Sequence, residues 1–242
     1  MNKLKALSLL LCAVLCMSCE NPFLKCLLPE NAPEVSAPAP APVEKDVAVL
    51  TLSPDRPVIR VMVTTADGSS VTVKGCTEAT LASGTETFLH AQGTRVTLKG
   101  KITELRCRNN KLTALDVQGL PLQRLDCRDN QLTSLDVQGL PLQELYCGGN
   151  RMTSLDVQGL PLQSLDCYKN KLDAAAFISI FDALPDYSGQ FYGAHCTVYS
   201  TEPGEGNCTN FTSPPALQTA FNGAKTKNWK MYKKTETVWQ EI

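Results

Sequence analysis

A nineteen-residue stretch, LQRLDCRDNQLTSLDVQGL at positions 122–140, decides the fold of this 242-residue chain. It returns twenty residues later, at 142–160, as LQELYCGGNRMTSLDVQGL, and the segments 102–120 and 162–172 fit the same frame. Equally spaced cysteines and asparagines mark the four units: Cys107, Cys127, Cys147, Cys167 and Asn110, Asn130, Asn150, Asn170. Repetition at a short fixed period predicts an architecture in which each unit packs mainly on its neighbours.

Within one unit, the pattern predicts a strand, a bend and a return segment. In residues 124–128 the alternation places Leu125 and Cys127 inward and the other three side chains outward. Asn130 is expected to turn the chain, with its amide satisfying backbone groups in the bend. The Gly-Leu-Pro that closes the first three units disfavours a helix on the return side, so we expect an extended or single-turn 3₁₀ segment there. One unit buries too little apolar surface to fold alone.

The frame LxxLxCxxNxL followed by TxLDVQGLP resembles the leucine-rich repeat. It is most similar to the cysteine-ladder repeats of internalin-J-like surface proteins and to the repeat adhesins of oral spirochaetes and Bacteroidetes. The resemblance covers 102–172, and residues 224–230 resemble the closing segment of the spirochaete and Bacteroidetes proteins. It implies an α/β-type solenoid with short twenty-residue coils and a parallel concave sheet. It also implies adhesion.

The residues on either side of the repeats predict caps rather than further domains. Short strands are expected at 47–52, 57–64 and 70–74 before the repeats, and at 95–98, where the first coil begins. After them, Asp173 is expected to cap a helix that ends at Leu184. Strands near 196–200 and 229–232 and a helix at 214–225, capped by Ser213, should follow. We therefore expect an N-terminal β cap at 45–94, leucine-rich repeats at 95–172 and a C-terminal α/β cap at 173–242.

The first 44 residues predict a secretion signal followed by a tether. Lys3 and Lys5 precede an apolar run at 6–15, which is typical of a secretory signal and shorter than the roughly 20 residues that span a bilayer. Ser18-Cys19 resembles the end of a bacterial lipoprotein signal (1–18), which would leave Cys19 as a lipidated, palmitate-bearing N-terminus. An ordinary signal peptide cut nearby is the alternative. The Pro/Ala-rich segment 19–44 then predicts a semi-rigid tether.

Cysteine is frequent, with 11 residues, whereas histidine occurs only twice. The repeat cysteines form a line, whereas zinc needs ligands that converge on one point, so we expect buried thiols and no metal or other cofactor. Cys196 and Cys208 either form a disulfide in an oxidising envelope or stay reduced. His195 beside Cys196 suggests a nucleophile pair, but neighbouring residues of a strand point to opposite faces. No catalytic residue is expected.

The outward positions of the repeat strands form the candidate binding face. Tyrosine and arginine, which are enriched at protein-binding hot spots, recur there among charges of both signs. The net charge of −1 provides no field that would attract nucleic acid. The alternative is a solvated sheet whose charges only keep the protein soluble. The candidate binding residues are Arg106, Arg108, Arg124, Asp126, Arg128, Glu144, Tyr146, Asp166 and Tyr168.

Signal, tether and repeats, in that order, predict a surface-tethered protein-binding module of the bacterial envelope, lipid-anchored in the outer membrane. We expect an adhesin that binds a protein on a host or neighbouring cell through its concave face. The alternative is a periplasmic structural or scaffolding lipoprotein. The expected partners are a protein ligand and, through the lipid, a membrane, with no nucleic acid and no small-molecule substrate. Nothing in the pattern supports an enzyme.

Overall fold

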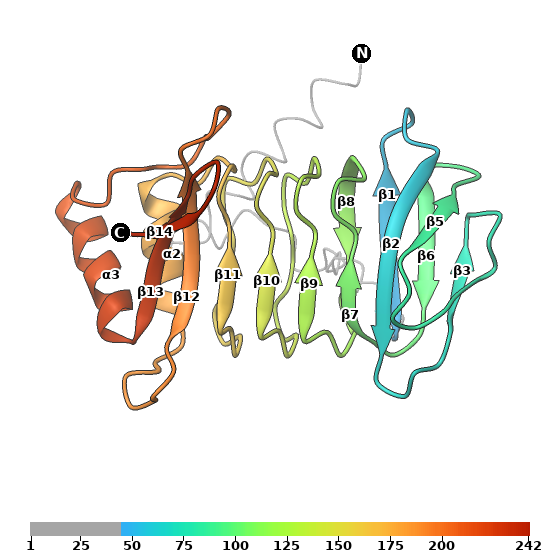
Figure 1. Ribbon diagram of the computed structural model, residues 1–242, viewed down its shortest axis with the longest axis horizontal. Coiled ribbons are helices and arrows are strands. Elements are labelled where there is room, and N and C mark those ends of the chain that lie inside the picture. The colour runs from blue at the N-terminus through green and yellow to red at the C-terminus, as the bar shows by residue number, and fades with distance from the viewer. Residues whose placement is uncertain (1–44) are drawn as a thin grey trace, which may run out of the picture. The chain divides into compact units, whose positions relative to one another are not determined.

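Two β-sheets organise residues 45–242, the part of the chain that the computed structural model describes (Figure 1). One sheet has nine strands, in the spatial order β14 (Trp239–Glu241), β13 (Trp229–Lys234), β12 (Ala194–Ser200), β11 (Ser164–Asp166), β10 (Glu144–Tyr146), β9 (Arg124–Asp126), β7 (Ile102–Arg106), β2 (Val58–Thr65) and β5 (Thr87–His90). The other has five, in the order β4 (Thr80–Leu81), β3 (Val71–Lys74), β6 (Arg95–Lys99), β1 (Val47–Leu52) and β8 (Leu112–Asp116). Helices α2 (Ala174–Ala183) and α3 (Pro215–Thr226) lie beside β12 and β13 in Figure 1.

The predicted α/β-type solenoid with a parallel sheet is wrong. The described residues are mostly β structure, in sheets of nine and five strands with only two helices, both after residue 172. The larger sheet is mixed, because β2 and β14 pair antiparallel with the two ends of the six parallel strands from β7 to β13, and β5 pairs antiparallel with β2. The smaller sheet is antiparallel throughout. The physical reason is that strands before the repeats pair onto both sides of the first unit.

Each repeat unit contributes one short parallel strand to the larger sheet. The twenty-residue period keeps equivalent residues in register, so that Leu105, Leu125, Leu145 and Leu165 form one column. All four leucines and the cysteines two positions later are fully buried. The predicted inward positions of leucine and cysteine are therefore confirmed.

The asparagine at each bend ties one unit to the one before it. The Asn130 side-chain oxygen accepts hydrogen bonds from the backbone N–H groups of Asn110 (3.0 Å) and Leu112 (2.9 Å). Its amide nitrogen donates to the carbonyls of Cys107 and Cys127, both at 3.0 Å. The predicted role of the amide in the bend is confirmed, and it extends across two units.

The C-terminal part continues this asparagine ladder with a residue outside the repeats. The Asn207 side-chain oxygen accepts from the backbone N–H groups of Asn170 (3.2 Å) and Leu172 (2.9 Å). Its amide nitrogen donates to the carbonyls of Cys167 (2.9 Å) and Val198 (2.8 Å). The last repeat is therefore capped by the same contacts that join the repeats.

The return segments contain no helix, as expected from their Gly-Leu-Pro endings. The first forms β8, and the next two, at 132–136 and 152–156, have neither helix nor strand. Each of the three segments closes in the same turn, in which glycine adopts a φ between 73° and 76°. The backbone N–H of the leucine that follows this glycine donates to the carbonyl of the valine three residues before it. A positive φ is accessible to glycine without strain, which explains its presence at this turn in the first three units.

The expected elements around the repeats are confirmed, with additions. Strands β1, β2, β3, β6, β12 and β13 and both helices fall at the predicted places, whereas β4, β5 and β14 were not predicted. Asp173 caps α2, since its carboxylate accepts from the N–H of Ala176 at 2.9 Å. Ser213 does not cap α3, because Pro214 occupies the N-cap position without a side-chain hydrogen bond.

The predicted signal peptide, the lipidated Cys19 and the tether lie outside the described residues. Within residues 45–242, no helix combines the length and the apolar character needed to cross a bilayer.

Candidate functional site

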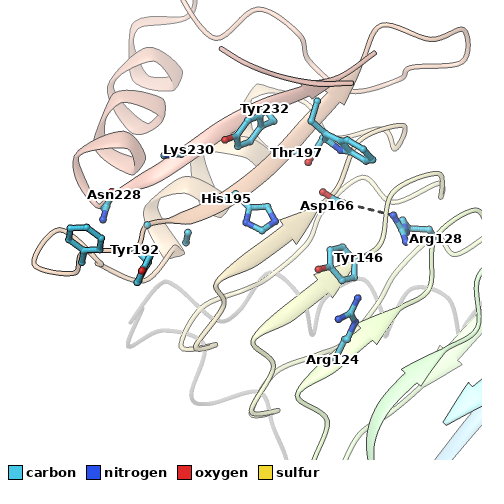
Figure 2. A pocket seen from close by; sticks show the side chains of 14 residues that line it. Arg124, Arg128, Tyr146, Asp166, Tyr192, His195, Thr197, Asn228, Lys230 and Tyr232 are labelled. Carbon is cyan, nitrogen blue, oxygen red and sulfur yellow. Dashed lines mark ion pairs between the residues drawn. The ribbon is translucent and has the colours of Figure 1, made fainter. Parts of the chain in front are cut away.

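A cleft of about 730 Å³ opens on the outward face of the nine-stranded sheet (Figure 2). We call this face, which carries the side chains of the repeat strands that point away from the core, the open face. The cleft lies where β9, β10 and β11 meet the C-terminal strands, and its volume is within the range of small-ligand sites. It is lined by Arg124, Arg128, Tyr146, Asp166, Phe191, Tyr192, Gly193, Ala194, His195, Thr197, Asn228, Lys230, Tyr232 and Trp239.

Strand register builds the floor of the cleft. Tyr146, Asp166, Thr197 and Tyr232 occupy one row across β10, β11, β12 and β13, because the four parallel strands pair these positions directly. In Figure 2 the labelled Tyr192 and Asn228 stand at one side of the cleft, and Arg124, Tyr146 and Arg128 stand at the other. Residues far apart in the sequence therefore converge on one site.

Arg128 and two aspartates form the charged centre of the floor. The guanidinium of Arg128 donates to both carboxylate oxygens of Asp126, at 2.9 Å and 2.7 Å, and a third nitrogen lies 3.7 Å from Asp166. Burial raises the pKa of Asp166, while the Thr197 hydroxyl and the charge of Arg128 oppose that shift. The bidentate pair holds the guanidinium in one orientation.

Tyr146 lies between two arginines. The guanidinium carbons of Arg124 and Arg128 are 5.2 Å and 5.1 Å from its ring centroid, within cation–π range. Its hydroxyl donates to Glu144 at 2.6 Å, and burial, followed by this carboxylate, raises the pKa of Tyr146. The ring is therefore fixed by contacts on both its face and its hydroxyl.

A chain of ion pairs continues along the open face from the cleft. Arg124 bridges two carboxylates, with nitrogens 3.3 Å from Glu104 and 3.0 Å from Glu144. Arg106 reaches the same Glu104 at 2.6 Å. Exposed pairs of this kind add little to stability.

Exposed aromatic side chains form the rim. Phe191 and Tyr192, on the loop between α2 and β12, are 93% and 82% exposed, and Trp239 of β14 is 55% exposed. The loop between α2 and β12 is anchored by Asn228, whose side-chain amide donates to the carbonyls of Tyr187 (3.2 Å) and Gln190 (3.0 Å). The aromatic rings therefore project from a braced backbone.

His195 projects into the cleft from β12. One of its ring nitrogens lies 2.8 Å from the hydroxyl of Ser164, a serine–histidine contact that invites an acyl-transfer interpretation. The backbone N–H groups of Ser164 and His195 already bond the carbonyls of Gln143 and Gln163, so they cannot serve as oxyanion donors. This contact therefore positions the imidazole. Cys196 is fully buried on the opposite side of β12.

The structure divides the predicted binding residues into three groups. Four of them line the cleft, namely Arg124, Arg128, Tyr146 and Asp166. Asp126 and Glu144 pair with these residues, and Asp126 lines a second hollow together with Arg106 and Arg108. Tyr168 lines neither hollow, and Asp126 and Asp166, which do, are themselves only 4% and 5% exposed.

Tyr168 is only 4% exposed, so the expectation that it presents its ring to a partner is wrong. The ring lies over Gly148, where an added Cβ would come within 2.9 Å of it, and the Lys234 ammonium sits 4.9 Å from its centroid. The missing side chain at Gly148 leaves the space that the ring fills.

Sequence reasoning missed the residues that the C-terminal part adds. Phe191, Tyr192 and Trp239 carry no periodic signal, because they lie in a loop and in a strand that was not predicted. His195 and Lys230 could have been predicted from the sequence, since they occupy outward positions of two strands that were predicted.

The considered disulfide between Cys196 and Cys208 is absent, and all seven cysteines of the described residues are free. Cys196 occupies the leucine column between Leu165 and Met231, fully buried. The thiol of Cys208 instead contacts the carbonyl of Asn210 at 3.4 Å. Packing in the core, rather than cross-linking, accounts for Cys196.

No known family model, curated protein or solved structure matches the chain. The candidate site is therefore defined by the geometry of the described residues alone.

Proposed function

We propose that the protein is a surface-tethered protein-binding module, an adhesin, that binds a protein on a host or neighbouring cell through its open face. The observation that carries this proposal is where the exposed aromatic side chains gather. Among the described residues, the large hydrophobic side chains that are exposed are Phe88, Phe191, Tyr192, Val238 and Trp239. Exposed apolar patches on a protein surface often mark sites of interaction with other molecules.

Two ends of the open face carry these side chains. Phe191, Tyr192 and Trp239 line the cleft at one end. Phe88 lies opposite Arg60 across the β2–β5 pair, and Arg60 borders the hollow that contains Arg106 and Arg108 at the other end. Directly paired residues share a face of a sheet, so Phe88 belongs to the open face too.

The stretch between the two ends is mixed in charge and joined by ion pairs. Arg128 is paired with Asp126 of its own unit, and Arg124 is paired with Glu144 of the next unit. Side chains that are already ordered lose little freedom on association, which favours binding. Their alternating signs favour a partner with complementary charges and disfavour others.

A pull-down from host-cell and envelope extracts tests this proposal. The wild-type chain should capture a protein partner, and the double variant Phe88→Ala/Arg108→Ala should bind it at least tenfold more weakly, as loss of interface anchors predicts. Arg151→Ala is the control, because it removes an exposed cation from the bend outside the open face. Equal capture by the double variant would contradict the proposed surface.

The envelope location belongs to the same proposal and rests on the sequence of residues 1–44. Mass spectrometry of the mature N-terminus should find a lipid-modified Cys19. Protease added to intact cells should remove the folded part. Survival of the protein until the envelope is broken would favour the periplasmic scaffolding lipoprotein instead.

A further inference from the structure

The cleft offers flat apolar surfaces at its rim and hydrogen-bonding groups on its floor. Trp239, Tyr192 and Phe191 present exposed rings, whose faces suit ligands with weakly polarised C–H groups. His195, Lys230 and Tyr232, which also line the cleft, supply donors and acceptors. A ligand that fills the cleft must therefore be apolar on one side and rich in hydrogen-bonding groups on another.

The charges of the cleft nearly cancel when the carboxylates that pair with its arginines are included. Its lining contains the cations Arg124, Arg128 and Lys230 and the anion Asp166. Two of these cations are already paired, Arg124 with Glu104 and Glu144, and Arg128 with Asp126. A site for a charged ligand needs an excess of one sign, which the cleft lacks once the carboxylates that pair with its arginines are counted.

Paired side chains still have hydrogen-bonding capacity to offer. Arg128 has donors beyond those that hold Asp126, and a carboxylate such as Asp166 accepts at several positions. Donors and acceptors thus stand side by side, 3.7 Å apart between Arg128 and Asp166. A hydroxyl group both donates and accepts, so adjacent hydroxyls match this arrangement.

A close backbone contact and turn hydrogen bonds hold the segments that carry the rim residues. Gly193 ends the aromatic loop so close to the backbone that an added Cβ would lie 2.4 Å from the carbonyl oxygen of Asn228. At the other side, the turn that leads to Trp239 is closed by hydrogen bonds between Thr235 and Val238, at 2.8 Å and 3.1 Å. A preformed rim reduces the ordering cost of binding.

We propose that the cleft binds a short neutral oligosaccharide, whose ring faces lie on Tyr192 and Trp239 and whose hydroxyls bond the floor. Sugar rings combine the required apolar faces and adjacent hydroxyls without charge. The cleft volume of about 730 Å³ suits a ligand of this size. This ligand is additional to the protein partner proposed for the open face.

An array of neutral cello-, malto-, chito-, manno- and xylo-oligosaccharides tests the proposal with the full chain. At least one of these series should bind saturably and change the tryptophan fluorescence. Trp239 is half exposed whereas Trp229 is 2% exposed, so a change on binding reports on the cleft. Titration of the best oligosaccharide should then give at least tenfold weaker binding for Tyr192→Ala and, by calorimetry, for Trp239→Ala.

Phe88→Ala is the matched control, because it removes an exposed aromatic ring from the far end of the open face. It should bind the oligosaccharide like the wild type. Both cleft variants alter exposed side chains, and an unchanged melting temperature shows that each still folds. Three results would overturn the proposal: no binding to any neutral oligosaccharide, binding only to sialylated or sulfated glycans, or binding that Tyr192→Ala and Trp239→Ala leave unchanged.

The test is separate from that of the protein partner. Loss of protein capture in Phe88→Ala/Arg108→Ala with normal sugar binding would support both proposals. Sugar binding without any protein capture would refute only the proposed adhesin, and protein capture without sugar binding would refute only the oligosaccharide site.

Discussion

At the scale of the residue, asparagine recurs at the bends because its amide is both donor and acceptor, and the fold uses both. Asn130 accepts two backbone hydrogen bonds and donates two more to carbonyl groups. An aspartate there would place a buried negative charge against the carbonyls of Cys107 and Cys127, and a serine would be too short to reach across two units. The asparagine spacing therefore carries structural information as strong as that of the leucines.

We predict that Asn130→Ala destabilises the protein by about 3 kcal/mol, because it leaves several buried backbone groups without partners. Urea denaturation followed by circular dichroism measures this loss. Thr133→Ala, an exposed position of the same unit, should change the free energy of unfolding by less than about 0.5 kcal/mol. Similar values for the two variants would show that the ladder is dispensable.

At the scale of the element, the loop between α2 and β12 depends on a close backbone contact. Trp229 donates its indole N–H to the carbonyl of Pro185 at 2.8 Å, and the backbone N–H of Tyr187 bonds the carbonyl of Lys227. Lys227 also donates to three carbonyls at the end of α2, which lack partners within the helix. The loop is thus fastened to both the helix and the start of β13.

We predict that Gly193→Ala and Gly189→Ala, in this one loop, differ sharply. A Cβ at Gly193 would lie 2.4 Å from the backbone oxygen of Asn228, whereas a Cβ at Gly189 would meet nothing within 4 Å. The first variant should therefore cost about 2 kcal/mol, as overpacking does, and the second almost nothing. Thermal unfolding of the two proteins compares them directly. Equal stability would mean that the loop can move away from Asn228 without cost.

At the scale of the whole molecule, one apolar core runs through the described residues. The core cluster includes β-strand residues before the repeats, the leucines and cysteines of every unit, and the aromatic residues of α2. Phe177 and Phe181 of that helix pack on Phe211 with ring centroids 5.2 Å and 5.8 Å apart. The residues on either side therefore cover the repeats as parts of the same core.

We predict that alkylation with iodoacetamide at about pH 8, mapped by peptide mass spectrometry, separates the cysteines by burial. Five peptides should be labelled only after unfolding: those with Cys107, Cys127, Cys147, Cys167 and Cys196, which are fully buried. Cys208 is partly exposed and should react in the native protein. Cys76 should react slowly, because burial and then Glu78 raise its pKa to about 11 and the thiolate is the reactive form.

Two observations would contradict this prediction. Labelling of Cys127 or Cys147 in the native state would mean that the core opens at the repeats. A Cys196–Cys208 cross-linked peptide under non-reducing conditions would mean that β12 rearranges in the oxidised protein.

Local pattern was sufficient for most elements and insufficient for the architecture. The alternation around Leu125 and Cys127 predicted the repeat strands, and Asp173 predicted the start of α2, because both signals act over a few residues. The α/β solenoid was wrong because strand pairing joins residues remote in sequence, such as Met62 with Arg106. Hydrophobic alternation predicts which face of a strand is buried, but it does not predict which other strand pairs with it.

The sequence by itself determined the period, the inward leucines and cysteines, the asparagine bends and most repeat residues of the open face, because each follows from local alternation repeated every twenty residues. The tertiary structure alone decided that Asn207 continues the ladder, that Tyr168 turns inward over Gly148, and that Tyr192, Trp239 and Tyr146 line one cleft. The physical reason is that these contacts depend on where non-repeating segments pack, and that packing minimises the free energy of the whole core rather than of any one segment.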